Sequence, residues 1–306
     1  MHTAKVQTTV DKKSSYQSTL PCYASLSEAL DCAADNDALH VFYPDVLAKK
    51  AAQFVSGFDG KVVYAVKANP HPEFLRGLWQ QGVVAYDVAS LREVELIREV
   101  LPEADMYFMH PVKSRQAIRY AYEQGVRIFA FDHGDELKKI IQETKSAEDL
   151  TLVLRCHVKV ARAAYELSGK FGAMADDAVA LLKQASMAAA RVGVSFHVGS
   201  QNLDVSAFEQ AIAQMAQLAQ KAQITLDVLD VGGGFPVAYP GMEPPSLDAY
   251  FQVIRKAVMK HGFAGVDLVC EPGRALVADA GKVLTRVEMR RGDVLYLNDG
   301  TYGALF

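Results

Sequence analysis

Short runs of β-branched and aromatic residues recur along most of this chain, and each is followed by a longer stretch with the hydrophobic period of a helix. Eight of these runs are expected to be strands, at residues 62–68, 83–88, 106–110, 127–132, 151–158, 194–199, 226–232 and 266–271. The helices expected between them include residues 91–101, 114–124, 134–144, 176–191, 205–221 and 247–261. Eight strands in unbroken alternation with helices predict a (β/α)8 barrel more strongly than an open, doubly wound sheet.

The two ends of the chain do not follow this alternation. Residues 1–22 are polar, and after residue 280 two expected strands, 282–289 and 293–297, flank a turn signal at 290–293. A two-stranded fragment is too small to be stable alone. The sequence therefore predicts an α/β protein, with a TIM-type barrel followed by an incomplete C-terminal β domain.

Composition excludes several classes of protein. Half of the 306 residues are hydrophobic, and the net charge is only −4. Basic residues form only short clusters, such as Lys12-Lys13, so no nucleic-acid partner is expected. No apolar run approaches the ~18 residues of a membrane span. The cysteines lack the close spacing of a disulfide scaffold or a zinc site, which favours reduced thiols in a cytoplasmic protein without a metal. They are Cys22, Cys32, Cys156 and Cys270.

Nearly every expected strand ends in a polar or ionisable residue. These are Lys67, Asp87, His110, Asp132, Arg155, His197 and Glu271, together with the glycine run 232–234. In a (β/α)8 barrel the carboxyl ends of the strands share one rim, and that rim carries the active site. Charged groups that converge there are hard to explain by packing alone. The sequence thus places a catalytic site at this end of the barrel.

Lys67 is the candidate nucleophile. It follows the apolar run 62–66, so we expect desolvation to lower its pKa and to favour the neutral amine that reacts with a carbonyl group. An ordinary surface lysine at a strand end is the alternative interpretation. The competing lysines near other motifs are Lys113 and Lys170, and neither ends an expected strand.

Two neighbouring loops have the residues of a phosphate site. The glycines at 232–234 follow the seventh strand, and glycines expose backbone N–H groups and allow an anion to approach closely. The Glu-Pro-Gly-Arg segment at 271–274 follows the eighth strand, where Arg274 can make a charge-assisted contact with the same anion. Ser200 adds a hydroxyl group from the loop after the sixth strand.

Seven motifs stand in order along the chain. They are Ala-Val-Lys-Ala-Asn-Pro at 65–70, Asp-Val-Ala-Ser at 87–90 with Glu93, Gly-Lys-Phe-Gly-Ala at 169–173, Ser-Phe-His-Val-Gly-Ser at 195–200, Asp-Val-Gly-Gly-Gly-Phe-Pro at 230–236, Glu-Pro-Gly-Arg at 271–274 and Asn-Asp-Gly-Thr-Tyr-Gly at 298–303. Together they resemble the motifs of the pyridoxal-phosphate-dependent decarboxylases of fold type III, which act on ornithine, lysine or diaminopimelate. The glycine and Lys-Phe-Gly-Ala motifs are more similar to the ornithine/lysine branch.

The resemblance implies a role for each residue of the rim. Lys67 would bind pyridoxal 5'-phosphate covalently, His197 would stack on its ring, and Glu271 would pair with its pyridine nitrogen. A carboxylate there keeps the nitrogen protonated and makes the ring an electron sink. The residues implied to hold the cofactor and its phosphate are Ser200, Gly233, Gly234, Pro272, Gly273 and Arg274. Those implied near the lysine and the ring are Asp87, Glu93 and Arg155.

The resemblance also implies a domain order. Residues 1–38 would associate with the β domain, residues 39–279 would form the cofactor-binding barrel, and residues 280–306 would begin the C-terminal β domain. Family members continue past the motif at 298–303 and complete the β domain there, whereas this sequence ends at Phe306. We therefore expect impaired turnover and poor dimerisation of the chain as given.

The implied reaction is α-decarboxylation of a basic amino acid, ornithine or lysine, to a diamine and carbon dioxide. The resemblance further implies a homodimer that acts in polyamine biosynthesis. One alternative is a non-catalytic, cofactor-binding paralogue with a regulatory role, similar to the antizyme inhibitors. Two alternatives among enzymes are a diaminopimelate decarboxylase and an amino-acid racemase of the same barrel type.

Overall fold

The protein is described by a computed structural model over residues 2–6, 20–32, 38–159 and 170–303. The chain forms two compact units, one of residues 51–275 and the other of residues 1–50 together with 276–306. The larger unit contains every strand of the barrel and every residue of the expected rim.

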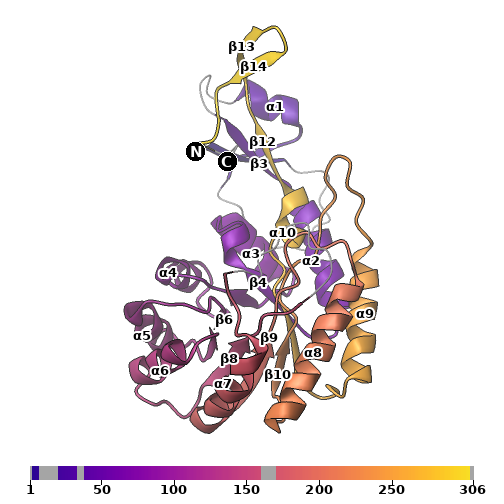
Figure 1. Ribbon diagram of the computed structural model, residues 1–306. Helices are drawn as coiled ribbons and strands as arrows, with labels where there is room; N and C mark the ends of the chain where they lie inside the picture. Colours follow the sequence, from indigo (N-terminus) through magenta and orange to yellow (C-terminus); the bar gives the residue numbers. More distant parts are fainter. Residues whose placement is uncertain (1, 7–19, 33–37, 160–169, 304–306) are drawn as a thin grey trace. The chain divides into compact units, whose positions relative to one another are not determined.

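The larger unit is built around a closed barrel of eight parallel strands (Figure 1). In chain order the strands are β4 (Lys61–Ala65), β5 (Ala85–Asp87), β6 (Asp105–Phe108), β7 (Ile128–Phe131), β8 (Thr151–Arg155), β9 (Arg191–Ser195), β10 (Val228–Asp230) and β11 (Asp267–Cys270). Each strand pairs with the next one along the chain, and β11 pairs with β4 to close the barrel. Each of the eight strands overlaps one of the runs identified in the sequence, so the predicted (β/α)8 barrel is confirmed.

Helices lie around the outside of the barrel and connect its strands (Figure 1). They are α3 (Pro72–Gln80), α4 (Leu91–Val100), α5 (Arg115–Glu123), α6 (Gly134–Glu143), α7 (Ala175–Ala188), α8 (Ser206–Ala222) and α9 (Leu247–Lys260). Ser90, Ser114 and Ser246 begin three of them by accepting a backbone N–H with the side chain. The expected helix 176–191 was too long at its end, because Arg191 pairs with Thr151 and begins β9.

Apolar side chains fill the interior of the barrel. Residues on a strand alternate between its two faces, so every second residue of each run points inward. The interior cluster consists of Val63, Ala85, Tyr107, Met109, Ala130, Val153, Val228 and Val269. The polar residues that follow the strands therefore lie at one end of an apolar barrel.

The smaller unit contains a four-stranded sheet in the order β12-β3-β1-β2. These strands are β12 (Gly281–Leu284), β3 (Leu39–Phe42), β1 (His2–Val6) and β2 (Cys22–Tyr23), and β2 is followed by α1 (Leu26–Asp31). Because β12 pairs with β3, segments that precede and follow the barrel share one sheet. The single strand expected at 282–289 is instead two strands. Its second part, β13 (Val287–Arg291), forms a hairpin with β14 (Val294–Leu297).

The division between the units differs from the expected barrel limits of 39 and 279. Strand β3 begins at Leu39, but it pairs with β1 and β12 and not with a barrel strand. The first division falls after Lys50, within helix α2 (Pro44–Gly57), and the second falls after Ala275. No helix in the described part of the chain is long and apolar enough to cross a membrane.

Candidate active site

Lys67 and Asp87 form an ion pair at the carboxyl ends of two adjacent strands. Lys67 does not end a strand, as the sequence suggested, but lies in a single 3-10 turn, Val66–Ala68, directly after β4. Its Nζ atom is 3.3 Å from Asp87 Oδ2, and Asp87 is the last residue of β5. The Asp87 side chain is almost fully buried, and its Oδ1 accepts a hydrogen bond from the backbone N–H of Met109 at 3.3 Å.

This ion pair decides the charge of the lysine. The negative charge of Asp87 raises the pKa of Lys67 above its ordinary value; burial opposes this, and Glu271 reinforces it. The Lys67 side chain is 62% exposed. The expected lowering of the Lys67 pKa is therefore wrong, because the neighbouring carboxylate outweighs desolvation.

His197 and Arg155 lie close to Lys67. His197 Nδ1 accepts a hydrogen bond from the Gly199 N–H at 3.0 Å, which places the proton of the neutral ring on Nε2. Burial lowers the pKa of His197 to about 3, and the nearby charges of Arg155 and Lys67 act in the same direction. The ring is therefore neutral, with a fixed orientation. Arg155 ends β8, and its guanidinium lies 5.5 Å from the centre of the Phe171 ring.

The glycine run at 232–234 leaves no room for side chains. Gly232 has φ of 65°, and a Cβ atom there would lie 2.1 Å from the Phe196 carbonyl oxygen. At Gly233 a Cβ atom would lie 2.8 Å from the Glu271 carbonyl oxygen and 3.2 Å from His197 Nε2. Gly234 has φ of 98°, and its Cβ atom would meet the backbone of the loop after β9. The turn thus presents bare backbone beside His197 and Glu271.

The loop after β11 is attached to the turn that carries Lys67. The Ala65 N–H donates to the Pro272 carbonyl oxygen at 3.2 Å, and a Cβ atom at Gly273 would lie 3.0 Å from Ala68 Cβ. Arg274, the next residue, donates to the hydroxyl group of Tyr239 at 3.0 Å. Residues at the ends of the first and last strands of the barrel are therefore held together.

The loop that contains Ser200 is attached to the glycine run. The Asn202 N–H donates to the Gly234 carbonyl oxygen at 3.0 Å. Gln201 exchanges two hydrogen bonds with the backbone of Val237, each 2.9 Å long. Sequence reasoning missed Gln201 and Asn202, although two buried amides directly after a motif are a recognisable signal.

Glu271 and Asp230 form a pair of acids that the sequence analysis did not identify. Asp230 is fully buried at the end of β10, and its carboxyl and that of Glu271 influence each other's pKa. Burial raises the pKa of Asp230 to about 7, and burial with the neighbouring Asp230 and Asp87 charges raises that of Glu271. Asp230 stands in the glycine motif, but its effect on Glu271 depends on the pairing of β10 with β11.

Three other residues of the expected site make contacts that stabilise nearby loops and helix ends. Glu93 accepts from the Ala89 N–H and Ser90 accepts from the Glu93 N–H, which is a capping box at the start of α4. Asp132 accepts from the Gly172 N–H at 2.9 Å and so holds the loop before α7. His110 packs its ring edge-on against Phe171, with the ring centres 5.2 Å apart.

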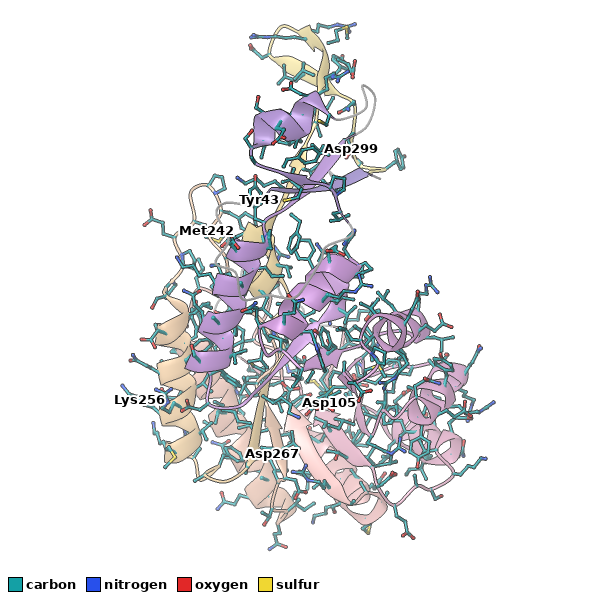
Figure 2. The ribbon with its side chains drawn as sticks, turned by 180° about the vertical axis from the view of Figure 1, so that it is seen from behind. Tyr43, Asp105, Met242, Lys256, Asp267 and Asp299 are labelled. Atoms are coloured by element: carbon teal, nitrogen blue, oxygen red, sulfur yellow. The ribbon has the colours of Figure 1, made fainter. Side chains whose placement is uncertain are left out.

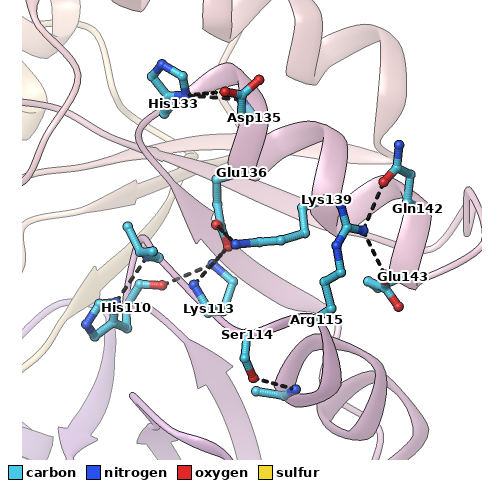
Figure 3. Close-up of polar contacts among 12 residues, drawn as sticks. His110, Lys113, Ser114, Arg115, His133, Asp135, Glu136, Lys139, Gln142 and Glu143 are labelled. Carbon is cyan, nitrogen blue, oxygen red and sulfur yellow. Dashed lines mark hydrogen bonds and ion pairs between the residues drawn. The ribbon is translucent and has the colours of Figure 1, made fainter.

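Lys113, the competing lysine, is occupied by a buried network (Figure 3). Its side chain has no exposed surface, and its Nζ atom lies 3.0 Å from Glu136 Oε1 and 3.0 Å from the His110 carbonyl oxygen. Burial lowers the pKa of Lys113 to about 8, while Glu136 opposes the shift. Lys139 pairs with the same carboxylate. Because its amine is enclosed by these partners, Lys113 is a structural lysine.

A depression of about 760 Å³ lies at the opposite, amino end of the barrel. Asp105 and Asp267, which begin β6 and β11, mark this end in Figure 2. Four of the charges that line the depression form two ion pairs: Lys61 lies 3.0 Å from Asp105, and Arg191 lies 2.7 Å from Asp267. Paired surface charges attract no ligand strongly, so this depression is not the candidate site.

The residues at the rim fit pyridoxal phosphate. Lys67 offers an amine for its aldehyde, and the glycine run offers backbone that an anion can approach. Glu271 Oε1 is a buried acceptor that has no donor among the described residues, and a protonated pyridine nitrogen is a donor of the kind it lacks. The neutral ring of His197 beside Gly233 provides a flat surface against which an aromatic ring can stack.

Comparison with known proteins agrees with this geometry. Residues 45–278 match the family described as pyridoxal-dependent decarboxylase, pyridoxal binding domain. The chain is 34% identical to the lysine/ornithine decarboxylase of Selenomonas ruminantium over 79% of its own length and 63% of the relative. It is 30% identical to antizyme inhibitor 2 of Xenopus laevis over 88% of its length and 63% of the relative.

A solved structure extends the comparison. The lysine decarboxylase of Selenomonas ruminantium superposes with a TM-score of 0.79 at 30% identity, over 90% of this chain and 73% of that one. The chain spans less than two thirds of the length of the curated relatives that it matches. Its matched segment is a pyridoxal-binding domain, and pyridoxal phosphate is the cofactor of that domain. The chain belongs to the pyridoxal-dependent decarboxylase family.

Proposed function

We propose that this chain binds pyridoxal 5'-phosphate at Lys67 and removes the α-carboxyl group of a basic amino acid, ornithine or lysine. One observation carries the proposal. Lys67 lies at the same rim of the barrel as Glu271, whose charge raises the Lys67 pKa, and Glu271 Oε1 has no hydrogen-bond donor among the described residues. The similarity to a lysine/ornithine decarboxylase supports the choice of substrate. We further propose a homodimer for the full-length family form, which light scattering would test, and a role in polyamine biosynthesis.

Several residues of the rim have a task in this reaction. Pyridoxal phosphate, when bound, provides an electron sink for the electron pair that departing carbon dioxide leaves behind. Asp87 Oδ2 holds the Lys67 ammonium in place, and Lys67 gives up its proton to solvent before it reacts, because only a neutral amine attacks a carbonyl carbon. Glu271 holds a proton on the ring nitrogen, and His197 supports the ring from one face. The glycine run, Ser200 and Arg274 bind the phosphate.

Trapping the cofactor on its lysine tests the first half of the proposal. The protein is incubated with pyridoxal phosphate, reduced with borohydride and digested, and the modified peptide is identified by mass spectrometry. We expect the label on Lys67 and its loss in Lys67→Ala. Lys138→Ala is the matched control, since Lys138 is exposed on α6 and pairs only weakly with Asp135 at 3.7 Å. A label that remains in Lys67→Ala would overturn the assignment.

Release of carbon dioxide tests the second half. Carboxyl-labelled ornithine, lysine, arginine and diaminopimelate are compared, each with the wild type and with Lys67→Ala. We expect release from ornithine or lysine to exceed release from the other two substrates and to require Lys67. Faster release from diaminopimelate would assign the chain to that branch instead. Racemised substrate without carbon dioxide would show an amino-acid racemase.

A regulatory, non-catalytic protein is the second candidate, and the similarity to antizyme inhibitor 2 favours it. The Lys67–Asp87 pair and the Glu271 oxygen, which has no donor among the described residues, indicate cofactor binding and do not separate this candidate from an enzyme. Cofactor bound at Lys67 with no carbon dioxide released from any of the four substrates would support this second candidate.

A further inference from the structure

Asp230 is a buried acid that the proposed reaction leaves without a task. It ends β10, where it pairs in register with Val269 of β11, and none of its surface is exposed. Glu271 lies two residues beyond Val269, directly after the end of β11, so its side chain is expected on the same face as Asp230 and two residues further along the barrel axis. Each carboxyl changes the pKa of the other, so the two groups lie within each other's electrostatic influence.

Both acids are attached to the same glycine. Asp230 Oδ1 accepts the N–H of Gly232 at 2.7 Å, and the N–H of Glu271 donates to the Gly232 carbonyl oxygen at 2.8 Å. This leaves Asp230 Oδ2 and Glu271 Oε1 buried, with no donor among the described residues. A buried acceptor without a donor is costly. A single proton held by the pair would supply the missing donor, because a protonated carboxyl donates a hydrogen bond.

We propose that Asp230 is a positioning residue for Glu271: it keeps a proton, donates it to the Glu271 carboxylate, and thereby leaves Glu271 as the acceptor for the protonated ring nitrogen of pyridoxal phosphate. The inference rests on the proposed function, which assigns the ring nitrogen to Glu271. In this arrangement the protons balance within the site. The two acids share one proton before binding; a cofactor that binds with its ring nitrogen already protonated adds no proton to the pair, so the shared proton settles on Asp230 and Glu271 becomes the charged acceptor.

The surrounding charges agree with a shared proton. Besides Glu271, the ionisable groups that face Asp230 are those of Asp87, Arg155, Tyr107 and Cys270, and Arg155 is the one cation among them in the described chain. Burial is the main reason that the pKa of Asp230 rises to about 7, and two adjacent carboxylates in such a place cannot both be charged without a large cost.

Asp230→Asn separates this role from a purely structural one. Asparagine keeps an oxygen for the Gly232 N–H and offers an N–H to Glu271, but it cannot titrate. Asp230→Leu, of similar size, removes the turn hydrogen bond as well and measures the structural contribution. Glu271→Gln, alone and combined with Asp230→Asn, shows whether Asp230 acts through Glu271.

Affinity for pyridoxal phosphate, measured between pH 6 and pH 9, is the main readout. If the protonated form of Asp230 is needed, the wild-type Kd rises about tenfold per pH unit above the Asp230 pKa relative to the Kd of Asp230→Asn. Titration of the ring nitrogen and of Lys67 affects both proteins and cancels in this comparison. In the Glu271→Gln background, Asp230→Asn should no longer change the pH profile.

Infrared spectroscopy of the protein without cofactor provides an independent readout. To remove the contribution of Glu271, the comparison is made in the Glu271→Gln background, where the protein near neutral pH should show a protonated carboxyl band that the double variant with Asp230→Asn lacks. Identical spectra for these two variants, together with identical pH profiles for the wild type and Asp230→Asn, would overturn the inference and leave Asp230 as a residue that only shapes the Gly232 turn. Failure of the wild type to bind the cofactor at Lys67 would instead overturn the proposed function, and the infrared difference would still report whether Asp230 keeps a proton.

Discussion

A methyl group at position 233 has no room between the loops that follow β9 and β11. The Cβ atom of Gly233→Ala would lie 2.8 Å from the Glu271 carbonyl oxygen and 3.2 Å from His197 Nε2. Gly233 does not have a positive φ, so alanine can adopt its backbone conformation. The effect of the substitution therefore comes from packing. The Glu271 backbone cannot yield easily, because its N–H is bonded to Gly232 at 2.8 Å in the barrel wall. We expect a cost of about 1–3 kcal/mol for this overpacking.

That cost should appear in both stability and cofactor binding. In a domain of this size each kcal/mol lowers Tm by about 2–4 °C. If the strain is relieved by displacing His197 and the glycine run, the same energy raises the Kd for pyridoxal phosphate about 5- to 150-fold. Calorimetry and absorbance titration measure the two quantities. Gly134→Ala is the matched control, since its Cβ atom would meet only Leu181 Cδ2 at an ordinary 3.7 Å. Wild-type Tm and wild-type Kd in Gly233→Ala would refute the close approach of these loops.

Three further predictions follow from the charges. Asp87→Asn removes the main cause of the raised Lys67 pKa, so the pH dependence of cofactor attachment should move to lower pH; Asp105→Asn, at the other end of the barrel, should leave it unchanged. Glu271 binds its proton more tightly when folded, so wild-type stability should fall as pH rises above its ordinary pKa of 4.5, and urea unfolding should show a smaller fall in Glu271→Gln. Lys113→Met leaves Lys139 as the remaining cation paired with the buried Glu136 and should lower the free energy of unfolding by about 3 kcal/mol. The control Lys138→Met should lower it by about 0.5 kcal/mol or less. Equal urea midpoints for the two variants would contradict a buried ion pair.

The barrel could be predicted because its signals are local. A run of β-branched and apolar residues predicts a strand such as β8, and a capping serine, Ser90, predicts the start of α4. Strands that alternate with helices in this way have few alternatives to a parallel barrel. The rim followed from topology, because the carboxyl ends of all eight strands must lie together once the barrel closes. The position of the candidate site at that rim could therefore be argued from the sequence.

The chemistry of the individual residues could not be predicted in the same way. Lys67 was expected to have a lowered pKa, and only the 3.3 Å contact with Asp87 shows why it is raised. Glu93 belongs to the family motif, but its hydrogen bonds make it part of a helix cap. Strand β3 has the composition of a barrel strand, yet it pairs with β12, which lies more than two hundred residues away.

The pairing of Asp230 with Glu271 shows the physical reason. An amino-acid sequence specifies which groups are present and which local structures they favour, because those preferences depend on near neighbours along the chain. A pKa depends on the charges and the water within a few ångströms, and those are brought by other strands. The register of β10 on β11 places two acids from different segments in one dry site. That register, set when the barrel closes, brings Asp230 close enough to Glu271 to raise its pKa further than burial alone does.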